Sequence, residues 1–65
     1  MAIRDTIKPI SYLKAHPAEL VDQVSRTREP VVVTQNGEPR AVLQDIESFE
    51  RMRRAVAILK LAAQG

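Results

Sequence analysis

The sequence predicts an α+β fold: a small three-stranded antiparallel sheet with two short helices, followed by a long C-terminal helix, and assembled as a dimer. Two observations lead to this prediction. Apolar runs flank Asn36-Gly37, and both residues tolerate the positive φ that a two-residue hairpin turn requires. Apolar residues then recur at intervals of three and four from Ile46 to Ala63, as on one face of a helix.

The composition indicates one small domain. The chain has 65 residues, a formal net charge of +2 and two aromatic residues, so its core is small. With no cysteine and a single histidine, we expect no disulfide, no metal site and no cofactor. No apolar run reaches the roughly 18 residues of a membrane span, and the N-terminus lacks a signal-peptide core, which favours a cytoplasmic protein.

The N-terminal third predicts a strand and two short helices. Thr6 to Lys8 is typical of a short strand, which Pro9 confines to an edge or an end. Ser11 fits the N-cap of a single turn over residues 12–15. The pair His16-Pro17 then ends that turn, because a residue before proline avoids helical backbone.

Pro17 is well placed as the first residue of the second helix, and Glu19 in its first turn favours the helix dipole. The apolar stripe of this helix is Leu20, Val21 and Val24.

The hairpin turn predicts the register of the two following strands. It places Gln35 opposite Glu38, Thr34 opposite Pro39, Val33 opposite Arg40, Val32 opposite Ala41 and Val31 opposite Val42. In this register Val31, Val33 and Val42 share one face, and the other face is also apolar. The helices of one chain can cover only one face, so we predict that a second subunit packs on Val31, Val33 and Val42.

The last helix changes character along its length. Asp45 predicts its cap, and Glu47–Arg51 and Glu50–Arg54 have the spacing of stabilising ion pairs. From Ala55 to Ala63 the helix is apolar nearly all round, a pattern typical of a buried helix. No further chain is present to bury it, so we expect it to bind another protein; packing on its own dimer mate is the alternative.

Three segments in this order resemble the Phd/YefM family of antitoxins from bacterial type II toxin–antitoxin operons: ISYLKAHPAEL (10–20), PVVVTQNGEPRAVL (30–43) and IESFE (46–50). The resemblance covers about the first 54 residues. It implies a dimer that binds operator DNA and represses its own operon, and a C-terminal arm that folds on a toxin, RelE/ParE-like or Doc-like. Accordingly, residues 1–50 are predicted to dimerise and bind DNA, and residues 51–65 to bind toxin.

The chain departs from the family pattern in two places. His16 and Thr34 stand where members often have basic residues, which shifts the expected phosphate contacts to lysines and arginines elsewhere. The sequence also stops at Gly65, where members usually continue with an acidic arm. Two interpretations remain open: a natural short form, or a piece that lacks most of the arm.

Two sets of site residues follow from the residues and the resemblance. The predicted DNA contacts are Arg4, Lys8, Ser11, Lys14, His16 and Arg40. The predicted toxin contacts are Phe49, Met52, Arg53, Val56, Leu59 and Lys60, as anchors of a helix in a groove. The structural alternatives are that Ser11 only caps, that His16 only ends a helix, and that Phe49 and Met52 close the chain's own core.

No enzyme is expected. The sequence has no nucleophile–base pair, metal cluster or phosphate-binding loop, and Gly37 is a turn glycine. The second functional class that the sequence permits is a protein–protein adaptor that does not bind DNA. A gel-shift with the upstream promoter fragment would separate the two.

Overall fold

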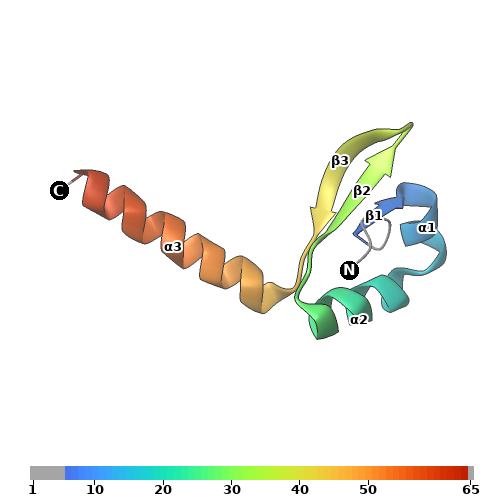
Figure 1. The fold of residues 1–65 in the computed structure, drawn as a ribbon, viewed down its shortest axis with the longest axis horizontal. Helices are drawn as coiled ribbons and strands as arrows, with labels where there is room; N and C mark the ends of the chain where they lie inside the picture. The colour runs from blue at the N-terminus through green and yellow to red at the C-terminus, as the bar shows by residue number, and fades with distance from the viewer. Residues whose placement is uncertain (1–5, 65) are drawn as a thin grey trace.

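The computed structural model describes residues 6–64, and Figure 1 shows their arrangement. The elements in chain order are β1 (Ile7–Pro9), α1 (Ile10–Ala15), α2 (Pro17–Thr27), β2 (Val31–Gln35), β3 (Glu38–Leu43) and α3 (Ile46–Gln64). Helices α1 and α2 lie together beside β1 and β2, whereas α3 leaves from the end of β3 in the opposite direction. The predicted α+β class, the two short helices and the long last helix are confirmed.

The sheet is mixed, so the prediction of an antiparallel sheet is wrong. The strand order is β1-β2-β3; β1 runs parallel to β2, and β2 runs antiparallel to β3. The reason lies between β1 and β2, where α1 and α2 form a helical crossover. Such a crossover returns the chain to the end where the first strand began, and it therefore makes the two strands parallel.

The hairpin turn is the predicted one, but its register is correct only next to the turn. Asn36 and Gly37 have φ of 53° and 78°, and the pairs Gln35–Glu38 and Thr34–Pro39 are present. Beyond them Val33 lies opposite Ala41, because Arg40 is an extra residue that forms a β-bulge. Arg40 directly follows Pro39, and proline within sheets is found at edges and bulges.

This one-residue shift separates the three valines that were predicted to share the dimer face. Side chains alternate along a strand, so the bulge turns every later β3 side chain to the other face. Val42 pairs with Val32 instead of Val31, and it no longer shares a face with Val31 and Val33. In the single chain Val31 is fully buried and Val33 is 3% exposed, whereas Val42 is 61% exposed.

The buried apolar core consists of Leu20 and Val24 from α2 and Val31 and Val33 from β2. Leu20 and Val24 are one helical turn apart and so point the same way. Val21, the third member of the predicted stripe, is half exposed. The core of the described residues is therefore small, as the length and composition indicate.

Helix ends follow local chemistry, with one exception. Pro17 is the first residue of α2, and the α3 cap is Asp45, whose Oδ2 accepts a hydrogen bond from the Ser48 N–H at 3.0 Å. The prediction that Ser11 caps α1 is wrong. Pro9 takes the N-cap position in extended conformation, so α1 begins directly at the end of β1 and Ser11 lies within it.

Helix α3 differs from the rest because none of its 19 residues is buried. It extends the molecule to 46 Å along its longest axis, against 26 and 21 Å for the other two. Among residues 6–64, no helix combines the length and the hydropathy that crossing a bilayer requires.

Candidate protein and nucleic-acid interfaces

An apolar row crosses the sheet on the face away from the core. Ile7 pairs with Val32 and Val32 with Val42, so the three side chains lie side by side across β1, β2 and β3. Ile7 is 44% exposed and Val42 61% exposed, and Val32 between them is partly covered. A row of this kind on a small domain is typical of a surface that another protein covers.

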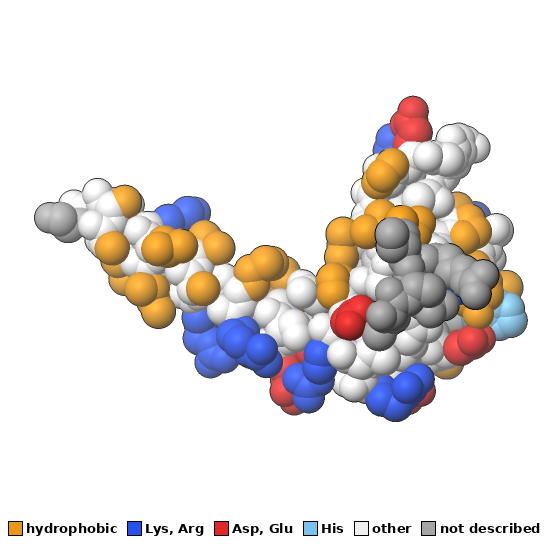
Figure 2. Space-filling view, in the orientation of Figure 1, with side chains coloured by type: hydrophobic (Ala, Val, Ile, Leu, Met, Phe, Trp, Pro, Cys, Tyr) orange, Lys and Arg blue, Asp and Glu red, His pale blue; other side chains and the backbone are white. Residues whose placement is uncertain are grey.

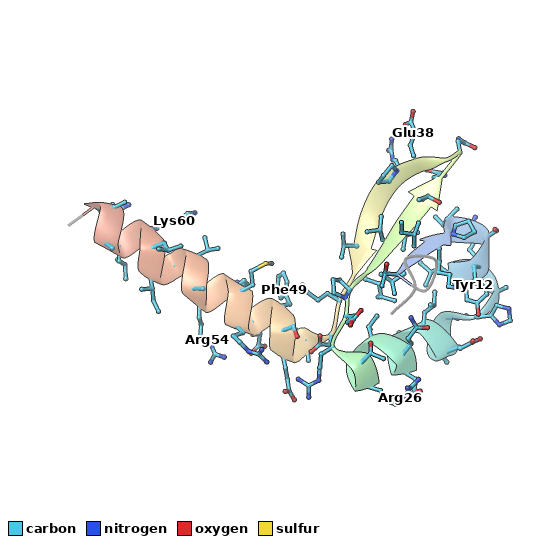
Figure 3. The ribbon with its side chains drawn as sticks, viewed as in Figure 1. Tyr12, Arg26, Glu38, Phe49, Arg54 and Lys60 are labelled. Atoms are coloured by element: carbon cyan, nitrogen blue, oxygen red, sulfur yellow. The ribbon has the colours of Figure 1, made fainter. Side chains whose placement is uncertain are left out.

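Val42 also forms one wall of a groove of about 560 Å³ between β3 and the start of α3. The groove is lined by Pro30, Val42, Gln44, Ile46, Phe49 and Met52. Hydrophobic side chains gather on both sides of the angle between β3 and α3 in Figure 2. Phe49 points into this angle and Arg54 points away on the opposite side of α3 (Figure 3).

The four predicted apolar toxin contacts form one stripe along α3. Phe49, Met52, Val56 and Leu59 follow intervals of three and four residues, which keeps them on one helix face. Their exposed fractions are 39, 51, 44 and 69% respectively. Phe49 and Met52 are therefore not part of the buried core of the single chain.

The two predicted basic toxin contacts accompany this stripe. Arg53 and Lys60 are exposed and seven residues apart, so they lie on the same side of the helix. All six predicted toxin contacts are thus on one element. Ile58 and Leu61, at 66 and 69% exposed, project from a different side, so the last half of α3 is apolar on more than one face.

Two of the predicted DNA contacts, Lys8 and His16, lie against the Tyr12 ring near the junction of α1 and α2. The Lys8 ammonium lies 4.6 Å from the centroid of the Tyr12 ring, and the His16 ring centroid is also 4.6 Å away. The Tyr12 hydroxyl donates a hydrogen bond to Glu19 at 2.9 Å, and His16 Nδ1 lies 3.3 Å from the same carboxylate. This cluster orients His16 and Lys8 on one exposed surface.

Glu19 changes the electrostatics of that surface. Its hydrogen bond raises the pKa of Tyr12 above the ordinary value of 10.0, and partial burial and the charge of Glu19 add to the shift. Glu19 also places a negative charge beside Tyr12 and His16, on the surface that was predicted to meet phosphate. Sequence reasoning missed this contact because Tyr12 and Glu19 are seven residues apart across a helix break.

The other predicted DNA contacts are distributed unevenly. Ser11 and Lys14 are exposed on α1 and three residues apart, so they share a side of that helix. Arg40 lies at the bulge in β3, which is separated from β1 by β2, and the structure does not bring it to the α1 surface. Arg4 lies outside the described residues.

A second ionic cluster, which the sequence pattern did not predict, joins the end of α2 to the start of α3. Arg28 Nη1 donates a hydrogen bond to Glu47 Oε2 at 2.6 Å and lies 3.6 Å from Asp45 Oδ2. Glu47 therefore pairs with Arg28 and not with Arg51. The predicted pair Glu50–Arg54 does not form either among the described residues.

The Asp45 carboxylate is held in its charged form. Burial favours the neutral acid, but hydrogen bonds from Ser48 and the nearby Arg28 guanidinium outweigh it, so the pKa of Asp45 lies below its ordinary value of 3.8. In residues 6–64 no group of three or more histidine, cysteine or acidic side chains is arranged to hold a metal ion.

Comparison with known proteins decides the family. A family model described as "Antitoxin Phd_YefM, type II toxin-antitoxin system" matches residues 5–65, which is nearly the whole chain. The chain belongs to the Phd/YefM antitoxin family. The resemblance stated from the sequence is therefore confirmed.

A curated protein and a solved structure to which this Phd/YefM chain is similar both come from Mycobacterium tuberculosis. The chain is 40% identical over 47 residues to Antitoxin RelF, an alignment that covers 72% of this chain and 50% of the relative. It is also similar, with a TM-score of 0.76 and 37% identity, to a chain in the crystal structure of the toxin–antitoxin complex RelBE2. That match covers 83% of this chain and 59% of the other. The Phd/YefM chain described here thus spans about half the length of the curated relative it matches.

Proposed function

We propose that this protein is an antitoxin that binds a cognate toxin, of the RelE/ParE-like type, through α3 and so neutralises it. The observation that carries the proposal is the exposed stripe of Phe49, Met52, Val56 and Leu59 on a helix with no buried residue. An amphipathic helix of this kind is stabilised when its apolar face lies in a groove of a partner. The similarity to a chain from the toxin–antitoxin complex RelBE2 supports a toxin as that partner.

We further propose that two copies of the chain associate through the outer face of the sheet. The row of Ile7, Val32 and Val42 forms one continuous apolar surface across the three strands. Val42 is the predicted dimer contact that remains exposed, and Ile7 takes the place that Val31 and Val33 had in the sequence prediction. Such a patch, unusual on a small monomer, supports a homodimer.

The dimer is proposed to bind operator DNA and to repress its own operon in the cytoplasm. Each copy offers the exposed Ser11, Lys14 and His16 at the α1 surface, with Lys8 beside them. Lysines at such a surface neutralise phosphates, and the hydroxyl and imidazole can reach phosphates or base edges. Arg4 and Arg40 stay predicted phosphate contacts, and Arg40 lies away from this surface.

Co-expression with the product of the adjacent open reading frame tests the main proposal. The expected result is that the adjacent product arrests growth alone, co-purifies with this chain, and becomes harmless in the complex. An adjacent product that neither arrests growth nor co-purifies would show that the antitoxin proposal is wrong.

The second candidate is an adaptor that binds its partner without binding DNA. One observation favours it: the Glu19 carboxylate lies within the proposed DNA surface, beside His16 and Tyr12. A gel-shift with the promoter fragment upstream of the gene separates the two, because an adaptor leaves the fragment unshifted at low salt.

A further inference from the structure

Arg28 ends α2 in an unusual backbone conformation. Its φ is 62°, in the left-handed region, and its N–H donates to the Val24 carbonyl at 2.9 Å. Glycine is the residue that most often ends a helix in this way, because it has no Cβ to clash. The chain has arginine here, and its side chain is engaged: Nε donates to the Ser25 carbonyl at 3.1 Å, and Nη1 reaches Glu47 and Asp45.

The contacts of Arg28 with Asp45 and Glu47 are called the Arg28 bridge below. Asp45 is 5% exposed, and its Oδ1 is buried without a hydrogen bond among the described residues. Its Oδ2 caps α3 through the Ser48 N–H. A buried carboxylate needs a compensating cation, and Arg28 is the basic side chain that the structure places beside it.

Helix α3 has little else to hold its direction. All of its residues are exposed or half-exposed, and beyond its first turns it projects into solvent, away from the sheet and α2 (Figure 1). Its base meets the rest of the chain at the short link of Gln44 and Asp45 after β3, at the groove and at the Arg28 bridge. The bridge approaches from the α2 side, whereas the groove lies on the β3 side.

We propose that Arg28 is a positioning residue: by bridging the end of α2 to Asp45 and Glu47, it fixes the direction in which α3 leaves the domain. The part of this inference that concerns a partner rests on the proposed function. The bridge prearranges the stripe of Phe49, Met52, Val56 and Leu59 relative to the sheet before a partner arrives. Prearranging a binding element reduces the ordering that association requires.

The Arg28–Glu47 contact is exposed enough that its own contribution to overall stability is small: the Arg28 side chain is 46% exposed and Glu47 67% exposed. The Arg28–Asp45 contact involves a buried carboxylate, so removing Arg28 also lowers stability by leaving that charge without its cation. A melting temperature therefore does not isolate the direction of α3. That direction can be measured directly.

The test uses two spin labels on the full chain, which has no native cysteine. Ala18→Cys on α2 and Ala57→Cys on α3 place labels at exposed positions outside the bridge and the apolar stripe. Dilution with unlabelled chain keeps the measured distance within one copy. We expect a narrow distance distribution in the parent and, in Arg28→Gly, at least about a doubling of its width.

Two further variants separate the bridge from a general loss of charge or of fold. Glu47→Gln removes the other end of the bridge and should widen the distribution in the same sense. Arg26→Gln is the matched control, because Arg26 is exposed on α2 and pairs at 3.7 Å with Asp22 of its own helix. An unchanged distribution in both Arg28→Gly and Glu47→Gln, or an equal widening in Arg26→Gln, overturns the proposal.

Partner binding provides a separate readout. We expect Arg28→Gly to weaken the affinity for a co-purified toxin about five- to tenfold, and Arg26→Gln to leave it unchanged. Because the distance measurement uses the chain alone, the two proposals fail independently. Widening in Arg28→Gly with no toxin binding in the parent supports the positioning role and overturns the antitoxin function.

Discussion

Residues 6–45 and helix α3 differ in how far their apolar side chains are buried. The first region buries Leu20, Val24, Val31 and Val33, at 0 to 3% exposed. Helix α3 leaves Phe49, Met52, Val56 and Leu59 at 39 to 69% exposed and buries none of its residues. The first region thus has a buried core beneath its exposed row of Ile7, Val32 and Val42, whereas α3 has no buried residue and is proposed to be covered by a partner.

The largest expected effect is a loss of stability in residues 6–45. Leu20→Ala removes a fully buried side chain from a core of four, so we expect a loss of about 2–5 kcal/mol in the free energy of unfolding. Urea denaturation followed by circular dichroism measures it. Val21→Ala on the same helix is the control: Val21 is 52% exposed, and its change should stay within about 0.5 kcal/mol.

In α3 we expect a substitution to weaken partner binding and to leave stability unchanged. Leu59→Glu should leave the fold intact but weaken toxin binding by at least about 2 kcal/mol, roughly thirtyfold, because the carboxylate would be buried in the partner's groove. Calorimetric titration of the co-purified toxin measures this loss. Arg54→Glu, on the side of α3 opposite Phe49, is the control. Loss of dimerisation in Leu59→Glu, with toxin affinity unchanged, would assign this part of α3 to the homodimer instead.

Val42→Glu tests whether the outer face of the sheet belongs to a second copy. A charge at this 61% exposed position should weaken self-association by about 1–2 kcal/mol with little effect on the monomer. Sedimentation equilibrium gives the dimer dissociation constant. Val21→Glu makes the same chemical change at another half-exposed valine, and equal weakening there would mean that Val42 is not at the interface.

The α1 surface predicts a smaller, salt-dependent effect. Lys14→Ala together with His16→Ala should weaken operator binding by about 1–2 kcal/mol and reduce the slope of log affinity against log salt by about one. Gel-shifts at several salt concentrations provide both values. Operator affinity that is unchanged in the double variant would show that DNA, if bound, is bound elsewhere.

The smallest expected effect concerns Asp45, the cap at the junction between residues 6–45 and α3. The folded-state pKa of Asp45 lies below its ordinary value of 3.8, so its stabilising contribution is complete above about pH 4 and is lost as the pH falls through that lower pKa. The start of α3 should then fray, which far-UV circular dichroism between pH 6 and pH 2 detects. Asp45→Asn retains a cap without the titration and should show a weaker pH dependence.

Local signals predicted much of the fold. Asn36-Gly37 predicted the turn, Pro17 the start of α2, Asp45 the cap of α3, and the three-and-four spacing the whole of α3. Each of these depends on chemistry within a few residues. The family was also correctly identified from the order of the segments.

The errors concern relations between distant parts of the chain. One extra residue at Arg40 reversed the faces of β3, and no local preference marks which residue of Pro39-Arg40-Ala41 is the unpaired one. The parallel pairing of β1 depends on where the α1–α2 crossover ends, which spacing does not give. Arg28 and Glu47 are nineteen residues apart, so a helix-spacing rule assigned Glu47 to Arg51 instead.

The buried core has a consequence for how such chains diverge. Within residues 6–64 the four buried apolar side chains come from α2 and β2, and none comes from β3 or α3, so exposed positions on those two elements can be exchanged without removing a core side chain. Duplicated genes could therefore keep one scaffold while acquiring new binding preferences within a few substitutions. Cross-reaction between paralogous pairs in one cell would then be limited by the chemistry of these two elements, with the scaffold unaffected.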